Sequence, residues 1–142
     1  MTSDTLPKVA ETFAGCVVDG NLEGAYDCFS ESLKATMSLA EFGELLRQAE
    51  KSVVPPKSFD TDSNSCSFED IKDSEFRGAL NAKEEVLAKI NPADFIQWMC
   101  IQFAPDPNDQ STNLDACYDF WFMVVAEKGA EKIAFFEIHY PE

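Results

Sequence analysis

The sequence has few of the residues that build the common metal and nucleotide sites. Its 142 residues include one histidine, five cysteines that form no C-x-x-C pair, and six scattered glycines. A structural zinc site requires clustered cysteine or histidine ligands, and a phosphate-binding loop requires clustered glycines. No G-x-S-x-G nucleophile motif occurs either. We therefore expect no metal and no nucleotide or other cofactor.

Basic residues are also scarce. The chain carries 11 Lys and Arg against 26 Asp and Glu, a net charge of −15, and no basic residue lies between Lys89 and Lys128. Such a field repels phosphate backbones and anionic lipid surfaces, so we expect no nucleic acid and no membrane as partner. A basic protein would be attracted instead, and residues 60–75 and 106–119 are the candidate acidic surfaces for it.

Long apolar runs are absent. No run approaches the roughly 18–20 apolar residues that span a bilayer. Residues 1–5 have neither the basic start nor the apolar stretch of a signal peptide. These features predict a cytoplasmic protein in which the cysteines are reduced thiols.

What the chain does contain is enough apolar material for a single domain over residues 1–142. Hydrophobic residues make up 45% of it, and twelve of them are phenylalanine. Apolar residues recur at helical spacing before Gly20, after Asn21, and after the capping-box pair Ser38 and Glu41. Ser30 is a candidate break within the second of these segments.

The second half of the chain changes character. Residues 57–77 are polar and predict a loop with one short strand near Phe59 or Phe68, and Asn81 with Glu84 predicts another capped helix. Three later runs are rich in aromatic and β-branched residues and are separated by turn signals: 95–103, 116–126 and 133–140. The sequence therefore predicts an α+β fold, with N-terminal helices packed on a C-terminal antiparallel sheet.

Both faces of these strands are apolar. Trp98 and Cys100 alternate with Met99 and Ile101, whereas an antiparallel sheet with one wet face would alternate apolar and polar residues. Because four short helices can cover only one face, we expect the sheet to curl around an apolar pocket. We also expect a second copy of the chain to cover the outer face as a homodimer. The aromatic candidates for the pocket lining are Tyr26, Trp98, Tyr118 and Trp121.

The order of three helices, a variable segment, a helix and three long strands resembles the nuclear transport factor 2-like superfamily. The opening looks similar too, because a helix over residues 13–20 ends in a Gly-Asn turn, a second follows at 21–29, and a leucine-rich third follows at 38–46. The resemblance covers most of the chain. It implies the cystatin-like, ketosteroid isomerase-like cone, in which a curved sheet surrounds an apolar cavity, and it implies dimerisation. No catalytic motif of that family's enzymes can be placed on this sequence.

The candidate proton-transfer groups are Asp119, Glu137 and His139. Glu137 and His139 are two residues apart, so they project from one face of a strand, and Asp119 lies on the neighbouring strand. Burial of a carboxyl group beside an imidazole raises the carboxyl pKa toward working pH, which suits acid–base catalysis. The alternative is that His139, near the end of its strand, is simply solvated.

Asp60, Asp62 and Asn64 match the alternating oxygen ligands that begin a calcium loop. The match then fails, because Ser65 stands where that loop needs glycine and Ile71 stands where it needs glutamate. We therefore expect no calcium site in this segment.

Taken together, these features favour a non-catalytic, dimeric binding module with a pocket for a small apolar ligand. Two alternatives stay open. One is an enzyme of the isomerase or dehydratase type that applies acid–base chemistry to a small substrate. The other is an acidic inhibitor or immunity-type module that binds a basic protein.

Overall fold

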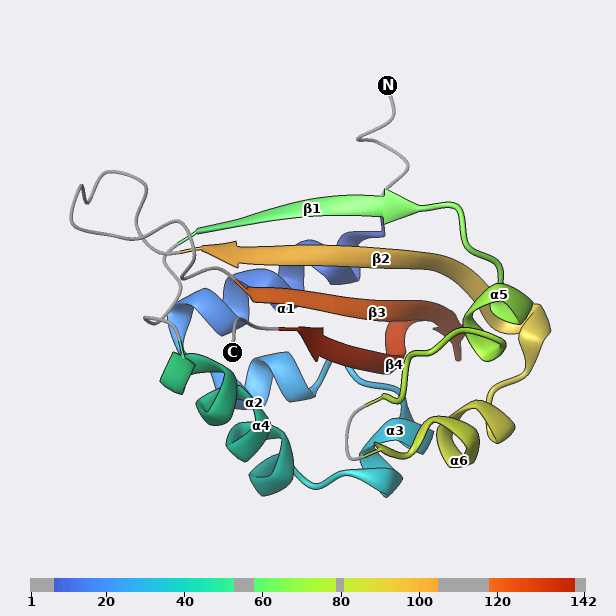
Figure 1. Ribbon diagram of the computed structural model, residues 1–142, viewed down its shortest axis with the longest axis horizontal. Coiled ribbons are helices and arrows are strands. Elements are labelled where there is room, and N and C mark those ends of the chain that lie inside the picture. Colours follow the sequence, from blue (N-terminus) through green and yellow to red (C-terminus); the bar gives the residue numbers. More distant parts are fainter. Residues whose placement is uncertain (1–6, 53–57, 79–80, 105–117, 140–142) are drawn as a thin grey trace.

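The computed structural model describes residues 7–52, 58–78, 81–104 and 118–139. Helices precede a curved, open antiparallel sheet, so the expected α+β arrangement is confirmed (Figure 1). The three expected β-runs form β2, β3 and β4, although residues 116, 117 and 140 lie outside the described ranges. The short strand expected near Phe59 is β1, which pairs with β2. The strands lie in sequence order: β1 (Ser58–Asn64), β2 (Phe95–Ala104), β3 (Tyr118–Glu127) and β4 (Ala130–His139).

Local caps set several of the limits of the first four helices. Gly20 ends the first of them with a φ of 77°, the left-handed conformation that glycine adopts without strain. Ser30 separates the second from the third, and its Oγ accepts a hydrogen bond from Leu33 N at 3.2 Å. The expected capping box is present, since Glu41 N donates to Ser38 Oγ at 3.1 Å and Ser38 N donates to Glu41 Oε1 at 2.9 Å. The helices are α1 (Lys8–Asp19), α2 (Leu22–Tyr26), α3 (Glu31–Thr36) and α4 (Leu39–Ser52).

Further short helices connect β1 to β2. They include α5 (Phe68–Lys72), α6 (Lys83–Ala88) and the 3-10 turn η3 (Pro92–Asp94). Phe68 begins a helix and not a strand, because Ser67 and Asp70 form a capping box before it. The cap expected at Asn81 is wrong: α6 follows Ala82, which makes no side-chain cap. Within the described ranges, no helix is long and apolar enough to cross a membrane.

The inner face of the sheet, which carries Phe120 and Phe136, packs against the N-terminal helices. The ring centroid of Phe13 in α1 lies 4.6 Å from that of Phe120, and Phe29 after α2 lies 5.2 Å from Phe136. Phe42 in α4 packs edge-on against Phe29 at 4.8 Å. All five side chains are at most 1% exposed. Aromatic rings therefore fill the interior between the helices and this face of the sheet.

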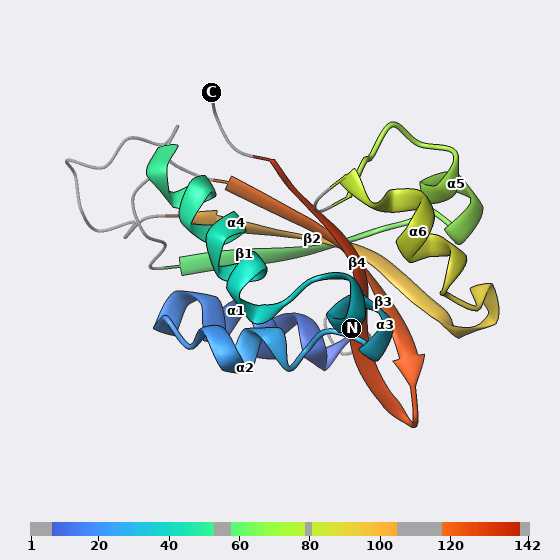
Figure 2. The ribbon, with the colours of Figure 1, turned by 90° about the horizontal axis from the view of Figure 1, so that it is seen from below.

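The outer face of the sheet carries Trp98, Trp121 and Phe135. Trp98 and Phe135 are buried, because α5, α6 and the segment between them lie across this face; Figure 2 shows α5 and α6 on the side of the sheet opposite α1 and α2. Phe76, from the connecting segment, packs its ring 5.1 Å from Trp98. The expectation that the helices of this chain cover only one face of the sheet is thus wrong. One set of helices covers the inner face, and α5 and α6 cover part of the outer face.

Candidate functional site

The structure brings the three candidate proton-transfer residues together at one end of the outer face. Asp119 on β3 lies directly opposite His139 on β4, and Trp121 lies opposite Glu137. His139 Nε2 is 3.0 Å from Glu137 Oε2, and the two side chains are 46% and 21% exposed. Asp119 accepts a hydrogen bond from Gln102 Nε2 at 3.3 Å. The group therefore lies on an accessible sheet face and not within an apolar interior.

Glu137 has a structural task in this arrangement. Its Oε1 accepts hydrogen bonds from the backbone N–H groups of Arg77 at 2.6 Å and Gly78 at 2.9 Å. These bonds attach residues 74–78, which we call the strap, to β4. Charge-assisted bonds of this kind are stronger than neutral ones, so the carboxylate fixes the position of the strap.

Gly78 allows the strap to lie this close to the sheet. Its φ is 77°, and a Cβ atom built on it would be 2.5 Å from Cε1 of the Phe135 ring. A side chain at position 78 would meet both the backbone strain of the left-handed region and a clash with a buried ring. Glycine is therefore required at the point where Glu137 holds the strap.

The four aromatic residues expected to line one pocket are divided between the two faces. Trp98 and Trp121 stack on the outer face with centroids 6.3 Å apart. Tyr118 is buried on the inner face, 5.2 Å from Phe103. Tyr26 lies among the N-terminal helices, on the inner side of the sheet, where its ring packs near Phe29 and Phe42. The four therefore do not form a single lining.

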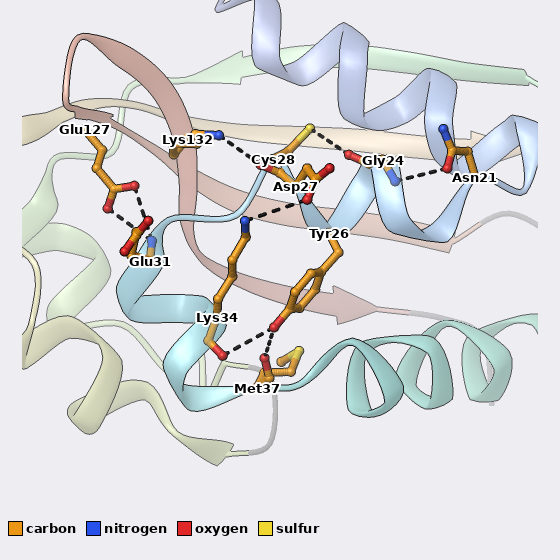
Figure 3. A network of polar contacts seen from close by, with 10 residues as sticks. All are labelled: Asn21, Gly24, Tyr26, Asp27, Cys28, Glu31, Lys34, Met37, Glu127 and Lys132. Atoms are coloured by element: carbon orange, nitrogen blue, oxygen red, sulfur yellow. Dashed lines mark hydrogen bonds and ion pairs between the residues drawn. The ribbon is translucent and has the colours of Figure 1, made fainter.

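Tyr26 belongs to a polar network that joins the helices to the β3–β4 hairpin (Figure 3). Its hydroxyl donates to the carbonyls of Met37 at 2.7 Å and Lys34 at 3.3 Å. Lys34 also pairs with Asp27 at 3.8 Å, and Lys132 of β4 donates to the Asp27 carbonyl at 2.9 Å. The partners are mostly backbone groups, so this network serves to hold α2 and α3 in place.

A hollow of about 1150 Å³ lies between α5 and α6, beside the strap. Its apolar lining comes mainly from Phe68, Phe76, Leu87 and Ile90. Charged residues of both signs complete it: Lys72, Arg77, Lys83, Asp73, Glu84 and Glu85. Neither the three proton-transfer candidates nor the four aromatic pocket candidates from the sequence line this hollow. An available signal was the Ser67–Asp70 capping box, which places Phe68 on a helix within a polar stretch.

Lys83 is the most enclosed cation of the hollow. Its Nζ donates to the carbonyl oxygen of Ser74 at 2.6 Å and to Ser74 Oγ at 3.3 Å. That hydroxyl also donates to the Ile71 carbonyl at 2.7 Å and accepts from Phe76 N at 3.2 Å. Within the described residues, no carboxylate pairs with the Lys83 ammonium.

Neither Cys28, which is buried, nor Cys100, which is half-buried, is an activated nucleophile. Burial, with the charges of Asp119 and Asp62 adding to it, raises the pKa of Cys100 to about 12. Burial also raises the pKa of Cys28 to about 11. The thiolate is the reactive form, so both thiols are protonated and unreactive near neutral pH. Cys117 lies outside the described residues.

The segment that imitates a calcium loop is an extended strand. Asp60 and Asp62 lie on β1, paired with Gln102 and Cys100 of β2. A calcium loop wraps its oxygen ligands around the ion, which a paired strand cannot do. In the part of the chain that the structure describes, no three His, Cys, Asp or Glu side chains gather as metal ligands.

Comparison with known proteins adds no relative from which a role could be transferred. No family model matches the sequence, no curated protein matches it, and no solved structure matches the fold.

Proposed function

We propose that this chain is a non-catalytic binding module that holds a small, mainly apolar ligand in the hollow between α5 and α6. The observation that carries the proposal is the hollow itself. It has apolar lining residues from two separate helices, and its volume of about 1150 Å³ is somewhat larger than the roughly 300–1,000 Å³ of typical small-molecule sites. The inner face is filled by phenylalanine rings, which favours a ligand site on the outer side of the sheet.

The arrangement of the acidic residues supports a non-catalytic role. Glu137 would be the carboxyl group closest to an imidazole, but its Oε1 already accepts two backbone hydrogen bonds. His139 is exposed beside it. A general base needs a free position and reach to a bound substrate, and the Glu137 carboxylate instead attaches the strap.

The test uses the neutral fluorescent probe N-phenylnaphthylamine, which has two apolar ring systems and no charge. We expect it to bind the folded protein. Ala88→Trp should weaken binding by at least about tenfold, because the indole occupies part of the hollow. The matched control is Ala40→Trp, which places the same side chain at an exposed position of α4. His139→Ala should leave probe binding unchanged.

Amide NMR shifts then locate the probe. Shifts confined to residues around Phe68, Leu87 and Ile90 would support the proposal. Shifts elsewhere, equal losses in the two tryptophan variants, or no binding at all would contradict it.

A second candidate function is recognition of a basic protein by the exposed end of the outer face. Asp60, Asp62 and Asp119 lie there, and no lysine or arginine in the described ranges pairs with them. The candidate surface at residues 106–117 lies outside the described residues. Association through this end would weaken steeply with added salt. Salt-independent binding of a partner would exclude it.

Self-association, cytoplasmic location and membership of the nuclear transport factor 2-like superfamily stay predictions. The case for a homodimer was the apolar outer face, and Trp98 and Phe135 on that face are now covered by the chain's own strap and helices. Among the described residues, the half-buried Trp121 and the exposed Ile96 of β2 remain as apolar surface for a second copy. Sedimentation at micromolar concentration distinguishes monomer from dimer. The order of helices before the sheet supports the superfamily assignment.

A further inference from the structure

The hollow gathers cations in a chain that has few. Lys72, Arg77 and Lys83 line it, three of only 11 basic residues in the whole sequence. In the described ranges, none of the three forms an ion pair. Carboxylates also surround the hollow, namely Asp73, Glu84 and Glu85, but all three are exposed to solvent. The hollow is therefore formally neutral, while the protein as a whole carries a charge of −15.

Lys83 differs from the other two cations because it is half-buried. An ammonium group has three N–H donors and needs an acceptor for each when water is excluded. Ser74 supplies two acceptors, its carbonyl oxygen and its Oγ, and both belong to the strap. The strap is in turn fixed by Glu137. The ammonium is thus held in position beside the apolar lining, and the described residues offer acceptors for two of its three N–H donors.

We propose that the ligand of the hollow is an amphipathic organic anion, such as a carboxylic acid with an apolar body. Its acidic group binds the Lys83 ammonium, and its body lies against Phe68, Phe76 and Leu87. This inference rests on the binding function proposed above and adds the chemical class of the ligand. The net negative charge of the protein repels anions, so binding of an anion in the hollow must depend on the local positive charge of Lys83.

The experiment compares two probes that differ only in a sulfonate group. Anilinonaphthalene sulfonate is the anion, and N-phenylnaphthylamine is its neutral counterpart. We expect the anion to bind the folded protein more tightly than the neutral probe. Lys83→Met keeps the aliphatic stem and removes the charge, so it should weaken the anion about tenfold and leave the neutral probe within about twofold. Lys83→Arg should retain most of the anion's affinity.

Two controls separate this effect from general charge and from misfolding. Lys8→Met removes an exposed lysine from α1 and should change neither affinity. Near-ultraviolet circular dichroism of each variant checks that the aromatic core stays packed.

The outcomes separate the two proposals. If the neutral probe binds in the hollow but the anion binds no tighter, or if Lys83→Met affects both probes equally, the anionic class is wrong and the binding module stands. If neither probe binds the folded protein, both proposals are overturned.

Discussion

The two faces of the sheet are covered in different ways. On the inner face, Phe13 of α1 packs on rings of β3, while Phe29 after α2 and Phe42 of α4 pack on Phe136 of β4, and the three rings also pack on one another. On the outer face, a strap and two short helices of five and six residues cover Trp98 and Phe135. One carboxylate, that of Glu137, attaches this cover at the strap. The inner face therefore provides stability, while the lightly attached outer cover leaves room for a site.

The largest expected loss of stability comes from removing a buried aromatic ring of the inner face, and the same change on the outer face gives the comparison. Phe120→Ala should lower the free energy of unfolding by about 3–5 kcal/mol, because a fully buried ring leaves a cavity among rings that cannot close it. Trp121→Ala, one residue along on the outer face, should cost about 1–2 kcal/mol because that ring is half-buried. Urea unfolding of both variants measures the difference. Equal losses would show that the two faces contribute alike.

The next prediction tests how closely the strap approaches the sheet at Gly78. Gly78→Ala should cost about 2–4 kcal/mol, from left-handed backbone strain together with the clash against Phe135. Gly129→Ala is the matched control, since Gly129 has a φ of 80° and a methyl group added there would meet no atom within 4 Å. It should cost only about 1–2 kcal/mol, the backbone strain alone. Thermal unfolding of the two variants, analysed at one temperature, gives the comparison.

A smaller effect is expected from the anchor itself. Glu137→Gln removes the negative charge that accepts from Arg77 N and Gly78 N, and should cost about 1–2 kcal/mol. Asp119→Asn, on the same face and bound only to Gln102 within the described residues, should be nearly neutral. Hydrogen exchange at the amides of Arg77 and Gly78 should accelerate in the first variant only. Unchanged exchange there would mean that the strap is held by packing.

The smallest effect concerns the thiol on the outer face. The pKa of Cys100 is raised from 9.0 to about 12, first by burial and then by Asp119 and Asp62. At pH 8, alkylation of Cys100 should be at least about a hundredfold slower in the folded than in the unfolded chain. Asp119→Asn should speed it a few-fold, because one negative neighbour is lost.

The raised pKa of Cys100 also makes the free energy of unfolding depend on pH in a known direction. A raised pKa means that folding favours the protonated thiol, so its contribution to stability is complete below pH 9 and is lost as pH rises toward 12. The free energy of unfolding should therefore fall over that interval. A rise there would contradict the assignment.

Local signals in the sequence predicted most of the fold. The caps at Ser30 and Ser38 act within three residues, so they can be read without tertiary knowledge. The tight turn at Lys128 and Gly129, which have φ of 53° and 80°, sets the pairing of Glu127 with Ala130. Asp119 comes to lie opposite His139 only because a register shift between Met123 and Val124 displaces the pairing by one residue, and no local signal predicted that shift. The spacing of Glu137 and His139 fixed their common face.

The outer cover could not be predicted in the same way. Helix α5 has five residues and only two apolar positions, Phe68 and Ile71, which is too short a stretch to show helical periodicity, and Phe76 follows alone in a polar stretch. The acceptor that fixes the strap is 60 residues away in sequence, so Glu137 had the pattern of a catalytic candidate when its partners were unknown. The hollow could not be predicted from the sequence, because it is formed by these long-range contacts.

The attachment of the strap also sets an order of events during protein synthesis. Arg77 and Gly78 leave the ribosome 60 and 59 residues before Glu137, the group that receives their N–H bonds. Until β4 has been made and paired with β3, those N–H groups remain bonded to water and the wall of the hollow is not fixed. The wall of the hollow is therefore complete only in a chain whose translation and folding have both reached the C-terminal hairpin.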